Sequence, residues 1–163
     1  MSTEENLTAA FSGESQANRR YTAFARRAEE EGLPSVAKLF RATAEAETVH
    51  ALNHLRAMGT VGNTEENLRA AIEGETYEFT EMYPAFIGEA ESDGSQQALI
   101  SFQSANAVEK VHASLYKKAL ENLDSQGDVS YFVCGICGHT VQGSAPDTCP
   151  VCQASKAQFK EIE

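Results

Sequence analysis

The sequence contains no long apolar run and few basic residues. No stretch of eighteen uncharged apolar residues occurs in the 163, so no segment can span a membrane as a helix. Lys and Arg number 13 against 24 Asp and Glu, and a formal charge of -11 argues against nucleic acid as a partner. The first five residues, Met-Ser-Thr-Glu-Glu, lack the basic and apolar regions of a signal peptide. We therefore expect the cytoplasm.

Cysteine is absent before position 134, and all four cysteines then fall within nineteen positions as two Cys-x-x-Cys pairs. In a reducing compartment this pattern indicates a metal site rather than disulfides. Two such pairs hold one tetrahedral metal, and a module this small needs the metal to fold. Iron and zinc both suit four thiolates. The predicted domain covers residues 129–163, with ligands Cys134, Cys137, Cys149 and Cys152.

The preceding residues carry the apolar periodicity of four long helices, which predicts an all-α four-helix bundle over residues 1–126. A Ser2-x-x-Glu5 capping box opens the first helix, and Gly32 ends it. Pro84 lies inside the third helix, where we expect a kink. The other predicted boundaries are Pro34 to Gly59, Asn63 or Thr64 to Asp93-Gly94, Ser95 to Leu123, and a linker at 124–128.

Glutamate and histidine recur at ligand spacing within the helices. Glu47-x-x-His50 and Glu109-x-x-His112 lie on the second and fourth helices, and Glu14 and Glu75 lie on the first and third. One Glu from each of two helices plus a Glu-x-x-His from each of the others is the ligand set of a carboxylate-bridged di-iron bundle. A single Glu-x-x-His is commonly a solvated pair. Two such motifs at matching positions favour a metal site. Carboxylates beside apolar residues also need cations, because an unpaired buried carboxylate is costly.

An internal repeat relates the two halves of the bundle. Gly13-Glu14-Ser15 matches Gly74-Glu75-Thr76 at an offset of 61, whereas the two Glu-x-x-His motifs match at 62, so one residue is inserted between. The symmetry fails at Glu78, which corresponds to Ala17. Glu78 lies about 300° around the helix from Glu75 and adds a carboxylate to nearly the same face. The alternative is an exposed carboxylate at the helix edge.

Other polar residues have plainer interpretations. Tyr21 and Tyr83 suit either packing or hydrogen bonding to the carboxylates. His54 lies one turn beyond His50, and we interpret it as a surface or packing histidine rather than a further ligand. His139 and Glu81 are expected to be solvated.

Four motifs resemble rubrerythrin over nearly the whole chain. They are Phe11-Ser12-Gly13-Glu14-Ser15-Gln16-Ala17, Ala44-Glu45-Ala46-Glu47-Thr48-Val49-His50-Ala51, Glu73-Gly74-Glu75 through Tyr83-Pro84, and Glu109-Lys110-Val111-His112. The cysteine module, with Cys149-Pro150 and Phe159, resembles the family's rubredoxin part. The resemblance implies a ferritin-like di-iron bundle followed by a rubredoxin-like domain.

The resemblance also implies residue roles and an activity. Glu47 and Glu109 would bridge two irons, Glu14 would hold the first iron, and Glu75 with His112 would hold the second. On reduction the first iron would exchange Glu78 for His50, with Tyr21 and Tyr83 hydrogen-bonded nearby. The implied activity is reduction of hydrogen peroxide to water. Electrons would pass from an NAD(P)H-linked reductase or a rubredoxin through the iron of the cysteine site. A ferritin-like ferroxidase or iron-handling protein, and a zinc-stabilised structural module, are the alternatives.

The connection between the second and third helices is short for a ferritin-like arrangement, in which these helices are parallel neighbours. Crossing the bundle needs about 30 Å, because His50 to Gly59 and Asn63 to Glu75 add about 13 and 18 Å of helix. Six Cα steps from Met58 to Thr64 span at most about 22 Å. We therefore expect a domain-swapped homodimer. The alternative is a helix that ends early and frees more linker.

Overall fold

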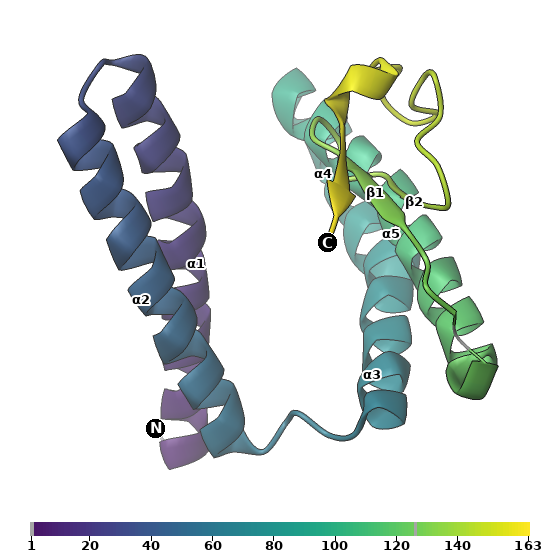
Figure 1. Cartoon of the computed structure of the whole chain (residues 1–163), viewed down its shortest axis with the longest axis horizontal. Coiled ribbons are helices and arrows are strands. Elements are labelled where there is room, and N and C mark those ends of the chain that lie inside the picture. The colour runs from purple at the N-terminus through teal and green to yellow at the C-terminus, as the bar shows by residue number, and fades with distance from the viewer. Residues whose placement is uncertain (1, 126) are drawn as a thin grey trace. The chain divides into compact units, whose positions relative to one another are not determined.

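The computed structural model describes residues 2–125 and 127–163. Helices form most of the chain, and a small three-stranded sheet follows them, which confirms the predicted fold class (Figure 1). The chain divides into two compact units, one ending at Gly62 and the other beginning at Asn63. This division places the cysteine module in one unit with the third and fourth predicted helices. The predicted domains, 1–126 and 129–163, stay a prediction.

The first unit is a pair of helices, α1 (Thr3–Glu30) and α2 (Pro34–Met58). The predicted capping box is confirmed, since the Ser2 side chain accepts from the Glu5 backbone and the Glu5 side chain accepts from the Ser2 backbone. Gly59 ends α2 in the left-handed conformation at φ 64°, as a helix-stopping glycine does. Because α2 extends to Met58 and the next helix begins at Thr64, the alternative of an early helix end is wrong.

Small residues form the contact between α1 and α2. Ala37, Ala44 and Ala51 recur every seven residues on α2 and are all buried. The buried Asn18 of α1 donates to the Ala44 carbonyl oxygen at 2.6 Å, which fixes the register of the pair. Several larger apolar side chains of this unit are exposed. They include Val36 at 41% and Leu39 at 63%. The unit therefore carries an apolar face that its own two helices do not cover.

The second unit begins with α3 (Thr64–Tyr77), a π-helical turn (Glu78–Met82), α4 (Tyr83–Ser92) and α5 (Gln96–Glu121). Asn63, one of the two predicted caps, caps α3, and it also forms a second capping box with Glu66. Both α3 and α4 pack on α5. At Pro84, where we expected a kink, the interruption takes the form of the π turn. Pro84 lies in the first turn of α4, directly after the π turn.

The π turn accounts for the inserted residue of the repeat. Three aromatic residues that contact one another in α1 and α2 have matching residues 62 positions later in the second unit. Glu14 and its match Glu75 are only 61 positions apart. The insertion therefore lies between positions 75 and 83. A π turn holds one more residue per hydrogen-bonded ring than an α turn, so it absorbs the insertion without rotating the flanking faces. The matched sets are Tyr21, Phe24 and Phe40, and Tyr83, Phe86 and Phe102.

The cysteine module is an antiparallel sheet in the order β2-β1-β3, with β1 (Tyr131–Cys134), β2 (Thr140–Gln142) and β3 (Phe159–Ile162). It packs on α5 through β2. The expectation that His139 is solvated is wrong. Its side chain is buried, and its ring contacts Phe159 at a centroid distance of 6.5 Å. Of the predicted linker at 124–128, Gln126 lies outside the described residues, and Asp124 and Ser125 belong to a 3-10 turn.

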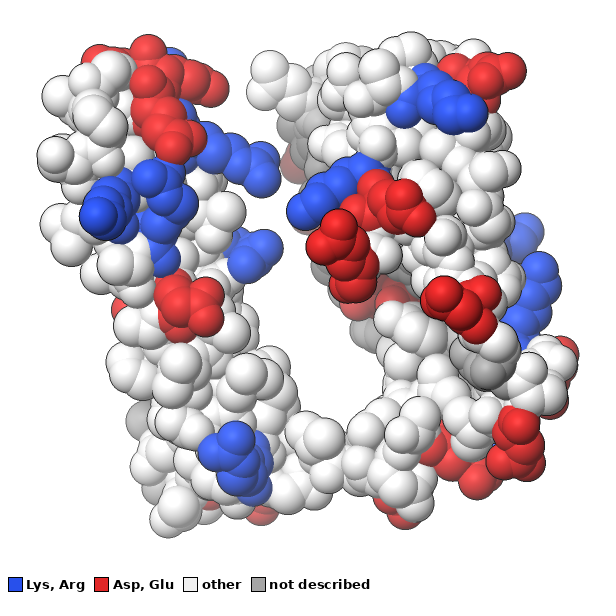
Figure 2. Space-filling model, in the orientation of Figure 1, with Lys and Arg blue, Asp and Glu red and all other residues white. Residues whose placement is uncertain are grey.

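Charge is divided unequally between the units. The first has seven basic and eight acidic residues, and the second has six and sixteen, so their formal charges are -1 and -10. Figure 2 shows basic side chains gathered on one part of the first unit, over α1 and α2. None of the described helices combines the length and apolarity that crossing a membrane requires.

Candidate metal centres

The first unit holds one three-residue cluster at the predicted positions. Ligand atoms of Glu14, Glu47 and His50 lie within 4.8 Å of one another. Glu14 comes from α1 and the other two from α2, where a spacing of three places them on one face. His50 Nδ1 lies 2.8 Å from Glu47 Oε2, and the His50 side chain is 55% exposed. His54 does not belong to this cluster.

The second unit holds the matching cluster. Ligand atoms of Glu75, Glu109 and His112 also lie within 4.8 Å of one another. His112 Nδ1 lies 2.7 Å from Glu109 Oε2 and 3.8 Å from Glu75 Oε2. The three side chains are half-buried, with the imidazole between two carboxylates. The internal repeat of the sequence therefore corresponds to two equivalent groups of ligand atoms.

The carboxylates of the second cluster are crowded enough to shift their own pKa values. Burial raises the pKa of Glu75 to about 7, and the neighbouring Glu109 carboxylate adds to the increase. Burial and Glu109 also raise the pKa of Glu78, while His112 lowers it. A partly buried carboxylate whose ionisation a neighbouring carboxylate opposes is in an environment that a bound cation relieves. This donor set fits iron, which accepts both carboxylate and imidazole.

Glu78 and Tyr83 flank this cluster on either end of the π turn. Glu78 is half-buried rather than fully exposed, and its charge interacts with Glu109 and His112. Burial raises the pKa of the Tyr83 phenol, and the charges of Glu78, Glu109 and Glu75 raise it further. Tyr83 is therefore a neutral hydrogen-bond donor beside the carboxylates. Tyr21, its counterpart, is half-buried among Phe24 and Phe40 in the first unit.

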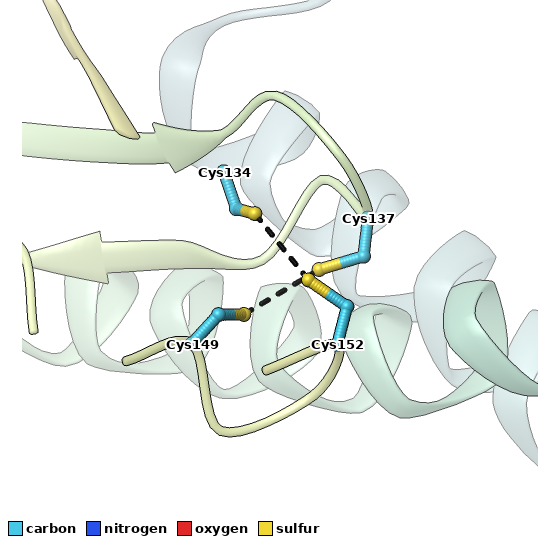
Figure 3. A group of neighbouring side chains, drawn as sticks. All are labelled: Cys134, Cys137, Cys149 and Cys152. Atoms are coloured by element: carbon cyan, nitrogen blue, oxygen red, sulfur yellow. Dashed lines mark hydrogen bonds between the residues drawn. The ribbon is translucent and has the colours of Figure 1, made fainter. Parts of the chain in front are cut away.

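The four cysteine sulfurs converge from two loops (Figure 3). Cys134 Sγ lies 3.7 Å from Cys152 Sγ, and Cys137 Sγ lies 3.6 Å from Cys149 Sγ. A tetrahedral metal with bonds of about 2.3 Å sets sulfur atoms about 3.8 Å apart, so the geometry fits one ion. Burial opposes ionisation of Cys134, but N–H groups of Cys137 and Ile136 outweigh it and lower its pKa to about 7. Burial raises the pKa of Cys137 to about 12, so four thiolates require a cation.

Comparison with known proteins agrees with both sites. The rubrerythrin family profile matches residues 5–120, and the profile of the rubredoxin-like domain of rubrerythrin matches residues 132–160. The chain belongs to the rubrerythrin family. The predicted resemblance is thus confirmed, and family membership makes the chain a di-iron oxidoreductase associated with oxidative stress, with iron fitting the bundle and the four-cysteine site.

Several rubrerythrin relatives align over nearly the whole chain. Nigerythrin of Nitratidesulfovibrio vulgaris is 37% identical over 172 residues, which cover 97% of this chain and 85% of the relative. Rubrerythrin-1 of Clostridium acetobutylicum is 34% identical, covering 97% and 93%. A structure described as fully reduced, all-ferrous nigerythrin matches with a TM-score of 0.61 and 35% identity, covering 99% of this chain and 87% of that one.

Three features of the site were not predicted from the sequence. Thr140 of β2 lies 3.0 Å from His112 Nε2, although the two residues belong to different modules. His139 is buried, and the π turn separates Glu78 from Tyr83. No periodic sequence pattern connects the cysteine module to α5, so neither the Thr140 contact nor the burial of His139 could be predicted. The π turn did leave a signal, because the offset of the internal repeat changes from 61 to 62.

Proposed function

We propose that this chain is a non-haem di-iron peroxidase that reduces hydrogen peroxide to water. The observation that carries the proposal is the pair of matched Glu, Glu, His clusters, one in each unit, together with a four-cysteine site in the same chain. These residues would hold two irons, which would supply two electrons to one O–O bond and Lewis acidity toward its oxygen atoms. With two protons, the products are two water molecules.

The ligand roles follow the repeat. Glu47 and Glu109 occupy equivalent positions in the repeat and would bridge the two metals. Glu14 binds the first metal, and Glu75 with His112 binds the second. Carboxylates neutralise ferric charge and imidazole suits ferrous iron, so a ligand set containing both accommodates the two oxidation states.

Glu78 and His50 would alternate as ligands of the first metal. His50 is the more exposed histidine, at 55% against 25% for the His112 side chain, and in its own unit its only hydrogen bond among the described residues is to Glu47. It is therefore free to turn toward or away from the metal. Glu78 begins the π turn and has no counterpart in the first unit. Tyr21 and Tyr83 act as hydrogen-bond donors, and the raised pKa of Tyr83 keeps its proton available.

Electrons reach the bundle through the iron bound by Cys134, Cys137, Cys149 and Cys152, which accepts one electron at a time. The donor is an NAD(P)H-linked reductase or a rubredoxin. A ferroxidase needs no external reductant, so a dedicated thiolate site favours the peroxidase over the iron-handling alternative. Zinc in the thiolate site would support only a structural role.

Stopped-flow reoxidation tests this function. Fully reduced iron-loaded protein is mixed with peroxide or with oxygen at equal concentration, and the ferric absorption is followed. We expect peroxide to reoxidise the protein at least about 10-fold faster, a difference of about 1.4 kcal/mol in barrier. Faster reaction with oxygen, followed by release of ferric iron, would instead establish the ferroxidase. A colourless protein that dithionite does not change would indicate zinc.

We also propose that each di-iron site is shared between two chains in a domain-swapped homodimer. Each unit holds half of the ligand set and exposes apolar side chains such as Leu39 (63%) and Ile100 (55%). The helix ends at Met58 and Thr64 keep the connection too short to cross a bundle. The formal charges of -1 and -10 have the same sign, but a first unit repels a second unit less than two second units repel each other, which favours packing a first unit on a second.

A further inference from the structure

One hydrogen bond joins the cysteine module to the second cluster, and a second bond within the module continues from it toward a cysteine. His112 of α5 places Nε2 3.0 Å from the Oγ1 of Thr140, and Oγ1 of Thr140 lies 3.1 Å from the carbonyl oxygen of Gly138. Gly138 follows the ligand Cys137 directly. A methyl group at Gly138 would meet Val108 Cγ1 of α5 at 3.9 Å, so helix and turn are in close contact here. His139 is not the link, because its ring packs on Phe159.

The chemistry of these groups sets the direction of both bonds. A carbonyl oxygen only accepts, and a threonine hydroxyl has a single hydrogen. Thr140 therefore donates to Gly138 and accepts from His112, which places a proton on Nε2. Without a metal, the 2.7 Å contact of Nδ1 with Glu109 Oε2 requires a proton between these two atoms. A bound metal would replace that proton and take the lone pair of Nδ1. That nitrogen is the one within 4.8 Å of the Glu75 and Glu109 ligand atoms.

We infer that Thr140 is a positioning residue through which the cysteine module orients His112 for the second bundle metal. The inference rests on the proposed metal site. A ligating histidine whose second nitrogen donates a hydrogen bond has a fixed tautomer and ring orientation, and it is a better ligand. His50 has no such anchor within the described part of its own unit. The two matched histidines are therefore inequivalent: the cysteine module holds His112 in place and leaves His50 able to move.

The test compares side chains with and without a hydroxyl group at position 140 of the full-length protein. The four-cysteine site is loaded with metal first. Thr140→Val and Thr140→Ala remove the hydroxyl, Thr140→Ser retains it, and Thr148→Val makes the matched change at an exposed position of the same module. Two quantities are measured: the affinity of the bundle for zinc alone, and the solvent exchange of the His112 Nε2 proton by nitrogen-15 NMR of the zinc-loaded protein. Thiolate-to-metal absorption of a cobalt-loaded sample reports whether the module is folded.

We expect Thr140→Val and Thr140→Ala to weaken zinc binding at the bundle about 10- to 100-fold and to expose the His112 proton to rapid exchange. Thr140→Ser and Thr148→Val should match the wild type in both measurements. The inference would be overturned, with the metal site intact, by unchanged zinc affinity and proton exchange in Thr140→Val. A loss of zinc affinity in Thr140→Ser as large as in Thr140→Val would have the same meaning. Failure of the wild type to bind zinc at Glu75, Glu109 and His112 would overturn the metal site and the inference together.

Discussion

Glu109 is the residue on which the interactions of the second cluster converge. It lies 2.7 Å from His112 Nδ1, and its charge raises the pKa values of Glu75, Glu78 and Tyr83. We expect Glu109→Ala to lose at least one iron per site and to lower the unfolding temperature of the metal-loaded protein. The metal-free protein should not be destabilised, because removing Glu109 relieves repulsion there.

Iron content and thermal unfolding, with and without chelator, check this expectation. Glu73→Ala, at an exposed position on α3, is the matched control and should retain full iron. Two irons per site in Glu109→Ala would show that Glu109 is not a bridge.

Glu78 has a narrower role, because it lies at the start of the π turn and outside the compact three-residue cluster. We expect Glu78→Ala to bind ferrous iron normally and to lower peroxide turnover about 10- to 100-fold. Crystals of the reduced and oxidised wild type would show the exchange directly. The same ligands on the first iron in both forms would rule out a Glu78/His50 exchange.

The spacing of the ligands was predictable at the residue scale, because Glu-x-x-His on one helix face and its repeat depend on local periodicity. Thr140 and His139 were not predictable. Their positions depend on how β2 packs on α5, and no sequence pattern encodes that contact. The burial of His139 follows from the same packing.

At the scale of elements, helix ends were predicted well because capping is short-range chemistry. Ser2 and Asn63 each cap a helix with a glutamate three residues later. The π turn was not predicted: Pro84 suggested a kink, whereas the inserted residue determines a wider turn before it. The buried alanines of α2, Ala37, Ala44 and Ala51, were also not predicted.

The four-cysteine module is the element that distinguishes a reductively driven enzyme from an iron-handling protein. We expect Cys149→Ser to abolish steady-state peroxide reduction driven by an external reductase, because its thiolate iron cannot form properly. Chemically reduced Cys149→Ser should still react once with peroxide in the bundle. Steady-state turnover of peroxide by Cys149→Ser, followed by NAD(P)H oxidation, tests this expectation. Activity equal to the wild type would mean that electrons enter elsewhere.

At the scale of the whole molecule, the proposed di-iron site needs both units. Each unit carries three candidate ligands and exposed apolar side chains, and the second unit is the more acidic of the two. The length of the connection was predictable from helix ends. Which chain supplies each half is a property of the assembly, and helix periodicity within one chain carries no information on it.

Complementation between two inactive chains tests directly whether one working site takes its halves from different chains. Glu47→Gln inactivates the first unit, and Glu109→Gln inactivates the second. In a swapped dimer made of one chain of each kind, one site carries both changes and the other carries neither. Mixed dimers, isolated with two different tags, should therefore recover about half of the wild-type peroxide turnover. Mixed dimers as inactive as either parent would show that both halves of each site belong to one chain.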